Sequence, residues 1–413
     1  MRHFIRFFTI IFLFVLSSEV NGQINFTNGG GDKLFSNAAN WAGGVVPTAA
    51  DKIKLDTNGD TIIVDGVYNV KQVLATKVKG AIIGNGGSDT LYINGNGGVN
   101  AVVQANGNDA RVAFHLPVVI ETTVGTATKS FQLNGAGSHI KFFDAYINNS
   151  MHLTIANPQN RANTQFLFDG KIKSKKWINI NSNVKATFGE NSDFTEHNSA
   201  VRLIGKGNAE LTVKSAKNKF KTAGTKLIVN GGGTLVADTE DVLKTTLQID
   251  GDKTLNLTVN ANQSNGGKIT MVTGKINLTV KNTVTNLDFP NNSTADWGTG
   301  TIDVTGFKNG VISFGTTASG ITSGQLALIT TDGLGTLSID EGGNLNTLDL
   351  FFSEYAEGGG NNKYLEIYNP TSATISLDGY ALPYVVNAPT TAGVHETWKT
   401  FADGASIASG DVY

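Results

Sequence analysis

The sequence has no cysteine among its 413 residues, which excludes disulfide bonds and a cysteine-linked lipid anchor. A chain of this size without disulfides must draw its stability from a large packed core or from a long hydrogen-bonded stack. Proline is also scarce, with 7 residues beside 49 glycines, so collagen and proline-rich linkers are excluded. The net charge is only −2, which argues against the basic face that general nucleic-acid binding requires.

The one long apolar run of the chain lies at its N-terminus. Arg2 and Arg6 accompany an apolar stretch at 7–16 that only Thr9 interrupts, and acceptable cleavage residues follow before Gln23. This combination predicts a secretory signal peptide over residues 1–22 rather than a buried strand, and the run is too short to span a bilayer. We therefore expect the mature chain to be secreted or displayed on the outer cell surface, with no transmembrane segment after signal removal.

Glycine and asparagine alternate with short apolar runs through the rest of the chain. Runs such as 61–64 and 165–168 are closed by Asn, Gly or Asp, which tolerate positive φ at a turn. A period of 3.6 residues is almost absent. The pattern predicts strands and turns from Gln23 to Asp349, without any helix of three turns or more.

An internal repeat in the middle of the chain favours one all-β architecture. Similar segments begin at Leu227, Leu247 and Ile269, so successive starts are 20 and 22 residues apart. This period fits one coil of a parallel β-solenoid (β-helix), with Leu, Ile and Val stacked inside and Asn ladders at the turns. A row of small sandwiches is the alternative, although the sequence marks out no compact sandwich core.

Two segments near the ends of this region share a pattern with known exported proteins. Near the start, Asn40 and Trp41 lead to Gly44, Pro47 and Asp51. This segment resembles the opening of autotransporter-associated β-strand repeats and related secreted β-helical proteins. Residues 301–345 are similar to the closing segment of the same class, with isoleucine at position 321 where leucine is usual. The resemblance implies a passenger-like β-solenoid over residues 23–349.

The stretch from 350 to 382 is the most distinctive of the chain. Its features are a strand ending in Ser353-Glu-Tyr355, a Gly/Asn loop at 358–363, a strand at 365–370 and Leu377-Asp-Gly-Tyr380. They resemble the opening strands of the lamin tail domain, an immunoglobulin-like β-sandwich often appended to secreted bacterial nucleases, phosphatases and surface proteins. The resemblance implies a binding or tethering module over residues 350–413.

Two expectations accompany the lamin-tail resemblance. Its carboxylates are expected to be exposed strand-face groups rather than metal ligands or acid/base catalysts, namely Glu354, Glu357 and Glu366. The segment 410–413 is similar to the start of a later strand of the same sandwich. We therefore expect a truncated sandwich, with an open sheet edge and an uncovered apolar face.

Motifs for catalysis are few. The sequence has no G-x-S-x-G elbow, phosphate-binding loop or H-E-x-x-H helix. The densest acidic segment contains Glu190, Asp193, Glu196 and His197, with Arg202 nearby, and we interpret it as a polar turn between coils rather than a paired-carboxylate site. The remaining histidines are scattered singly without metal-ligand spacing, at His115, His139, His152 and His395.

Three polar clusters have a structural interpretation and a functional alternative. Residues 84–92 resemble one calcium-binding nonapeptide, but a calcium roll needs tandem copies, so we expect a plain turn. Two basic clusters are expected to be solvated solenoid faces rather than nucleic-acid contacts, and they comprise Lys171, Lys173, Lys175 and Lys176, and Lys214, Lys217, Lys219 and Lys221. We predict no catalytic, cofactor-binding or metal-binding residue and no cofactor.

Taken together, the sequence predicts an exported, non-catalytic β-solenoid with a partial lamin-tail-like module. The expected role is adhesion, a stalk, or binding of glycans or extracellular matrix and surface components, because a solenoid offers a long face for many weak contacts. The alternative is the ancillary part of a secreted hydrolase, either a polysaccharide-active β-helix or a nuclease whose catalytic domain follows residue 413.

Overall fold

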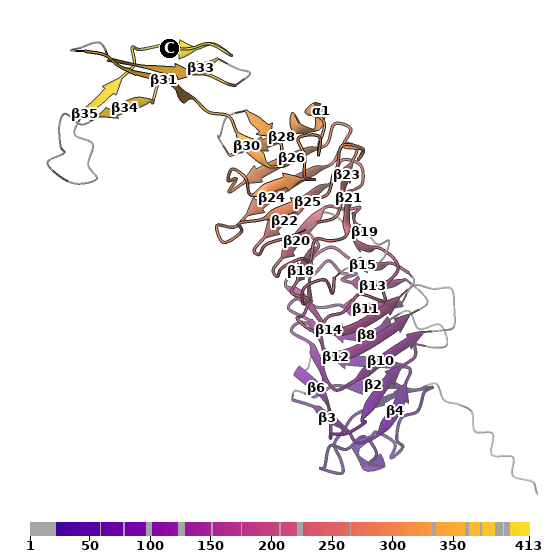
Figure 1. Cartoon of the computed structure of the whole chain (residues 1–413). Coiled ribbons are helices and arrows are strands. Elements are labelled where there is room, and N and C mark those ends of the chain that lie inside the picture. The colour runs from indigo at the N-terminus through magenta and orange to yellow at the C-terminus, as the bar shows by residue number, and fades with distance from the viewer. Residues whose placement is uncertain are drawn as a thin grey trace, which may run out of the picture. The chain divides into compact units, whose positions relative to one another are not determined.

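The protein is built almost wholly of β-strands (Figure 1). The computed structural model describes residues 22–57, 59–76, 79–95, 101–122, 129–149, 152–174, 176–205, 208–220, 226–264, 266–332, 336–359, 363–371, 374–384, 391 and 397–413. In these residues the only α-helix is α1 (Ser323–Leu326), which is one turn long, and η1 (Ala38–Asn40) is a single 3₁₀ turn. The prediction of no long helix is thus confirmed, whereas the predicted signal peptide, except residue 22, lies outside the described residues.

The strands form a parallel β-solenoid with two long sheets. In the described part of the chain, sheet 1 has 11 strands and sheet 2 has 15, which corresponds to about 11 turns. The chain divides into two compact units, Met1–Gln165 and Phe166–Tyr413, and each is described by itself below. The predicted fold class is therefore confirmed for the solenoid, and it rests on parallel pairing throughout both sheets.

In unit 1, the coils pass alternately between the two sheets. Its sheet 1 strands are β1 (Gln23–Asn25), β2 (Lys52–Leu55), β5 (Gln72–Thr76), β8 (Ala101–Asn106), β11 (Lys129–Leu133) and β13 (Leu153–Ala156). Its sheet 2 strands are β3 (Thr61–Val64), β4 (Val67–Val70), β6 (Lys79–Gly84), β7 (Thr90–Ile93), β9 (Arg111–His115), β10 (Val118–Thr122) and β12 (His139–Asn149).

In unit 2, the same alternation continues with shorter coils. Its sheet 1 strands are β15 (Ile178–Ile180), β17 (Val201–Leu203), β19 (Lys226–Val229), β21 (Thr246–Ile249) and β23 (Ile269–Met271). Its sheet 2 strands are β16 (Val184–Phe188), β18 (Glu210–Val213), β20 (Gly233–Ala237), β22 (Thr254–Val259), β24 (Lys275–Val280), β26 (Thr301–Thr305) and β28 (Ile329–Thr331), and β14 (Thr164–Ser174) contains the boundary between the units.

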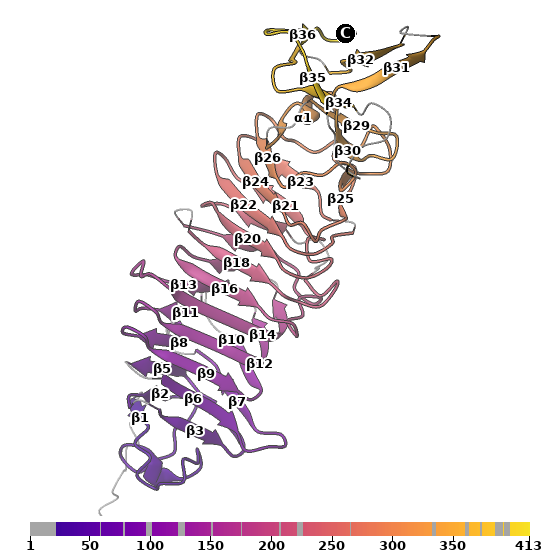
Figure 2. The ribbon, with the colours of Figure 1, turned by 90° about the vertical axis from the view of Figure 1, so that its left-hand side faces the viewer.

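The repeat found in the sequence corresponds to three stacked strands, β19, β21 and β23. Leu227 pairs with Leu247, and Leu247 pairs with Ile269, so the offsets of 20 and 22 residues are those of successive coils. On sheet 2 of the same coils, β18, β20, β22, β24 and β26 lie one above another (Figure 2). The interpretation of the repeat as one coil is confirmed.

The core consists of columns of like side chains along the stack. Leu235, Leu257 and Leu278 occupy paired positions on β20, β22 and β24, and all three are buried. Strand residues alternate between the two faces of a sheet, which places every second side chain of β24 inside. Each coil therefore buries its apolar side chains against the coils before and after it.

Asparagine and glutamine side chains link successive coils on the outside. The Asn277 side-chain amide donates to Asn256 (2.8 Å), Asn208 donates to Asn183 (2.7 Å), and Gln104 donates to Gln132 (2.8 Å). These bonds run between residues 21 to 28 positions apart, which is one coil. Amide bonds between coils are thus present, but those of Asn256 with Asn277 and of Gln104 with Gln132 lie on strands rather than at the turns where ladders were expected.

The segment with the N-W-G-P-D pattern covers the first coil of unit 1. Trp41 is buried, packs edge-on against Phe35 at 4.9 Å between ring centroids, and donates from Nε1 to the Phe35 carbonyl (2.8 Å). Asn40 is also buried and donates to Asp32 (2.6 Å). Asp51 accepts from the backbone and hydroxyl of Thr48. The motif residues Asn40, Trp41 and Asp51 therefore stabilise the segment that covers the first coil.

The last coils of unit 2 include an additional two-stranded parallel sheet and the one-turn helix α1. The strand β25 (Leu287–Phe289) pairs in parallel with β27 (Ile312–Phe314). The turn α1 is closed by a capping box between Thr322 and Gln325, and the buried Gln325 amide donates to the carbonyls of Asn292 and Ala295. After it, β29 (Leu337–Ile339) and β30 (Leu345–Thr347) form an antiparallel pair.

The described residues of the segment 350–413 form three antiparallel strand pairs and no further parallel coil. These are β31 (Phe351–Glu357) with β32 (Lys363–Tyr368), β34 (Ala381–Tyr384) with β35 (Thr397–Thr400), and β33 (Ile375–Ser376) with β36 (Ser406–Ile407). Their buried apolar cluster contains Ile367, Leu377 and Ile407. The chain end returns to β32, because Ile367 and Tyr413 exchange two backbone hydrogen bonds.

Candidate functional site

The acidic segment singled out in the sequence lies in the turns between β16 and β17. The Asp193 carboxylate accepts from Lys219 Nζ (2.8 Å) and from the hydroxyl of Thr195 (2.6 Å). Partial burial acts to raise the pKa of Asp193, but these hydrogen bonds outweigh it and lower the pKa to about 2. Glu196 pairs with Lys171 and Lys173, and the Lys171 hydrogen bond lowers its pKa as well. Neither acid is suited to donate a proton near neutral pH.

The remaining members of that segment do not complete a catalytic pair. His197 is fully buried, and its Nδ1 lies 3.0 Å from the Ser174 carbonyl oxygen. Burial lowers its pKa to about 4, so the ring is neutral at pH 7. Glu190 is exposed on the turn after β16. Arg202 belongs to sheet 1, on β17, where it contacts other side chains.

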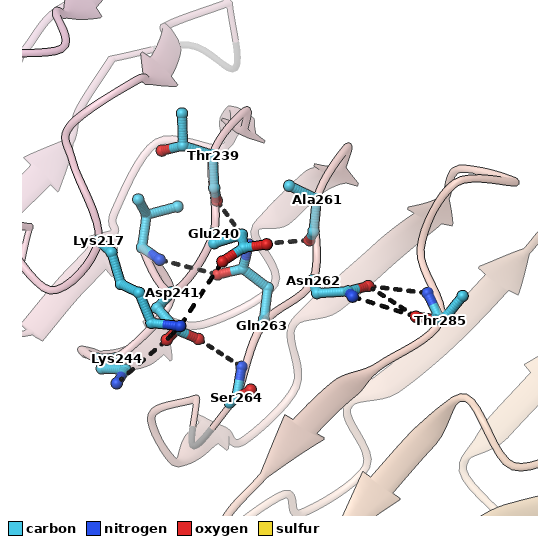
Figure 3. A network of polar contacts seen from close by, with 11 residues as sticks. Lys217, Thr239, Glu240, Asp241, Lys244, Ala261, Asn262, Gln263, Ser264 and Thr285 are labelled. Carbon is cyan, nitrogen blue, oxygen red and sulfur yellow. Dashed lines mark hydrogen bonds and ion pairs between the residues drawn. The ribbon is translucent and has the colours of Figure 1, made fainter.

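The basic clusters of unit 2 form ion pairs between coils. Lys214 pairs with Asp238 (3.4 Å), and Lys185 pairs with Glu210 (3.6 Å). Lys217 reaches both Glu240 and Asp241, and Lys244 also contacts Asp241 (Figure 3). Lys175 and Lys221 of the predicted clusters lie outside the described residues.

The turn network in Figure 3 connects four successive coils, because Lys217, Asp241, Gln263 and Thr285 follow β18, β20, β22 and β24. The buried Gln263 side chain accepts from the backbone of Val242 (2.9 Å) and donates to the Thr239 carbonyl (2.8 Å). The neighbouring Asn262 accepts from the backbone N–H of Thr285 (2.8 Å). Since these polar groups satisfy one another, the network stabilises the turns and leaves no cluster suited to catalysis there.

Residues 84–92 form a turn between β6 and β7. The Asp89 carboxylate accepts from the Asn85 backbone N–H (2.8 Å), and Gly86 and Gly87 have positive φ. The carboxylate thus closes the turn, as expected for a plain Asn/Gly/Asp turn. Of the scattered histidines, His139 and His152 are half-buried, His115 is exposed, and His395 lies outside the described residues.

Three glutamates of residues 350–413, Glu354, Glu357 and Glu366, lie on the β31–β32 hairpin. Glu354 accepts from the Tyr364 hydroxyl (2.7 Å), Glu366 accepts from the Ser353 hydroxyl (2.7 Å), and Glu357 pairs with Lys363 (2.6 Å). Glu354 and Glu366 occupy paired positions across the hairpin, but each carboxylate accepts from or pairs with a different side chain. Among the described residues no group of three or more acidic, histidine or cysteine side chains could hold a metal ion.

An exposed aromatic platform lies on the outer face of sheet 1 in unit 2. Trp177 precedes β15, and 41% of its surface is exposed. The Arg202 guanidinium lies over its ring, 4.1 Å from the centroid. No carboxylate among the described residues pairs with Arg202, whose Nε instead donates to Asn230 (2.8 Å). A planar cation is therefore fixed against an exposed indole.

Polar side chains continue this platform over the next two coils. Asn230 donates to Asp250, and Gln248 Nε2 also donates to Asp250 (2.8 Å). Lys226 Nζ donates to the Gln248 side-chain oxygen (2.9 Å). We define the Trp177 platform as Trp177, Arg202, Lys226, Asn230, Gln248 and Asp250.

The sequence analysis missed this platform because its members come from four coils of unequal length. Ile178 pairs with Val201 and Val201 pairs with Leu227, so these coils advance by 23 and 26 residues. A tryptophan directly before a β-strand in a lysine-rich turn was the available signal. Arg202 was noticed, but it was assigned to the acidic segment rather than to Trp177.

Comparisons of the chain with protein-family models, with curated proteins and with solved structures find no match. In the part of the chain that the structure describes, no helix has the length and apolar character needed to cross a membrane.

Proposed function

We propose that the protein is an exported binding protein whose solenoid presents the Trp177 platform to extracellular glycans. The observation that carries the proposal is Arg202 stacked on an exposed tryptophan beside a chain of amides and a carboxylate. An indole offers a flat apolar surface to the C–H face of a sugar ring, while guanidinium and amide groups donate to its hydroxyls. The wider role is adhesion to, or spacing from, a glycan-bearing surface.

The solenoid supports this role because it holds the platform rigidly. Arg202 lies on β17, between β15 and β19 of a hydrogen-bonded parallel sheet. Binding groups on a regular sheet lose little conformational freedom when a ligand binds. Repeated weak contacts along a surface then add through avidity.

The proposal is tested with a panel of immobilised neutral glycans. Trp177→Ala should reduce binding about tenfold or more, and Arg202→Ala should have a smaller effect, because the ring supplies most of the contact area. Trp398→Ala removes another exposed tryptophan and serves as the matched control. Unchanged glycan binding by a folded Trp177→Ala variant would contradict the proposed site.

The proposal also requires binding without turnover. We expect no cleavage of pectin, alginate, agarose or DNA above background, because Asp193 and Glu196 are held in ion pairs. The assay measures reducing ends or acid-soluble nucleotides over a long incubation. Turnover that disappears in Glu190→Gln or Asp193→Asn would instead support a hydrolase.

We further propose that residues 350–413 belong to an immunoglobulin-like sandwich of the lamin-tail type that acts as a tether. Three antiparallel pairs around Ile367, Leu377 and Ile407 are compatible with part of such a sandwich. Export through the N-terminal signal peptide of residues 1–22 belongs to the same proposal. Identification of the N-terminus of the secreted protein by mass spectrometry tests it, with Gln23 expected as the first residue.

A further inference from the structure

An apolar row runs across the outer face of sheet 2 in unit 1. Ile63 pairs with Ile83, and Ile83 pairs with His115 on the next coil. Leu34 adjoins Ile63 at one end, and the ring of Phe143 stacks on His115 at the other. We name Leu34, Ile63, Ile83, His115 and Phe143 the outer row.

The outer row is separate from the core. Phe142 points inward and stacks on Phe114, 4.7 Å between centroids, and both rings are buried. Phe143 and His115 lie on the opposite face, stacked at 4.3 Å with 11° between their planes, and Phe143 is 40% exposed. A phenylalanine turned outward where a polar residue would normally be placed leaves a flat apolar surface uncovered.

A basic row lies beside the outer row on the same strands. Lys79 pairs with Arg111, and Arg111 pairs with His139 on the next coil. Between the two rows are Ala81, Ala113 and Lys141, whose alanines leave the surface flat. Burial lowers the pKa of His139, and the positive charges of Arg111 and Lys141 lower it further. His139 is therefore less readily protonated, and the positive charge beside the apolar surface comes from Lys79, Arg111 and Lys141.

Arg111 of the basic row and the neighbouring Lys141 form few ion pairs among the described residues. The ion pair of Arg111 with Asp109 is long, at 3.9 Å, and no partner bonds to Arg111 Nε among the described residues. Lys141 makes no ion pair in the same part of the chain. The carboxylates on these strands and the adjoining turns are Asp60, Asp65, Asp89, Asp109 and Asp144. Asp60, Asp65 and Asp89 each accept a hydrogen bond from a nearby backbone N–H. Arg111 and Lys141 are thus available to an external anion.

We propose that the outer row and the basic row together bind an extended acidic polysaccharide, such as a polyuronate. Its sugar rings would lie on the apolar row, and its carboxylates would pair with Arg111 and Lys141. The five positions of the outer row span roughly 19 Å at the spacing of β-strands, so the surface matches several sugar rings in line. Charge complementarity selects the acidic polymer over a neutral one, and the ring stack selects sugars over a plain polyanion.

The test measures binding of alginate or polygalacturonate to the full chain by calorimetry at low and moderate salt. Phe143→Ala should weaken binding about five- to tenfold, whereas Phe143→Tyr should retain it. The double variant Arg111→Gln, Lys141→Gln should weaken binding by a similar factor and reduce its salt dependence. Both variants are compared with the parent for thermal unfolding, and the double variant decides the matter if Phe143→Ala does not fold.

Two reference polymers and one further variant complete the test. Dextran, which is neutral, should bind at least tenfold more weakly than the polyuronate. Polyglutamate should also bind weakly, and equal affinity for it would overturn the proposal in favour of a general polyanion or acidic-protein surface. Trp177→Ala should leave polyuronate binding at this surface unchanged, so a failure here is distinguishable from a failure of the Trp177 platform.

Discussion

The solenoid coils after residue 165 and the segment 350–413 use the same kinds of residue in different ways. In the coils, Leu257 is 1% exposed and lies between Leu235 and Leu278 of the adjacent coils. Among the described residues of 350–413 the buried apolar cluster has three members. Several large apolar side chains there are exposed, including Phe351, Phe352, Tyr355, Tyr364, Leu365, Tyr384, Trp398 and Tyr413. Apolar content alone therefore does not determine core size. Repetition does, because every coil supplies a covering surface for the next.

The largest expected effect is on stability, and it distinguishes the core of the coils from the core of residues 350–413. Leu257→Ala should destabilise the coils by about 3 kcal/mol, because it removes a side chain packed on both sides along the stack. Leu377→Ala should instead lower only the unfolding temperature of residues 350–413, which we expect to unfold in a separate transition. Differential scanning calorimetry measures both transitions. If the main transition moves equally for both substitutions, the two regions unfold as one cooperative unit.

Limited proteolysis compares the local stability of the same two regions. We expect trypsin and thermolysin to cut first after residue 349, for example at the exposed Lys399, while the coils persist. The small core and the exposed apolar side chains of 350–413 are the physical reason. Mass spectrometry of the fragments identifies the cut sites. Survival of 350–413 for as long as the coils would show that this region has a complete, stable core.

A smaller effect is expected from the ion pair of Asp193 with Lys219. The pKa of Asp193 is lowered to about 2, so its contribution is present above its unfolded pKa near 4 and is lost as pH falls towards 2. Asp193→Asn should cost about 1 kcal/mol at pH 7, since Lys219 is half exposed to solvent. Urea unfolding at pH 7 and at pH 2 measures the difference, which should vanish at the lower pH. A constant difference across this range would contradict the assignment.

The smallest expected effect concerns one step of the amide ladder. Asn256→Ala should cost about 0.5 kcal/mol, because its bond to Asn277 is exposed and water can replace it. Thermal unfolding of the variant beside Asn346→Ala, which removes an amide of β30 that donates to Asp340, provides the comparison. A loss of several kcal/mol would show that the ladder, rather than the apolar column, holds adjacent coils together.

The sequence was sufficient to predict the solenoid, but not to predict which side chains meet on its surface. Leu227, Leu247 and Ile269 could be aligned because their coils have nearly equal length and identical apolar spacing. The partner of Asp193 could not be inferred, since Lys219 is 26 residues away and coil lengths vary. Similarly, Phe143 is adjacent in sequence to the inward Phe142, so the direction of each ring depends on the register of β12 with β9.

The ion pairs between adjacent coils also bear on how such a protein can change its length. Lys185 with Glu210 and Lys214 with Asp238 each join one coil only to the next. Gain or loss of one whole coil by duplication or deletion therefore removes no long-distance contact and shifts the ends by about 4.8 Å. The length of the stack can thus evolve in small, nearly equal steps, as long as the segments that cover its first and last coils are retained.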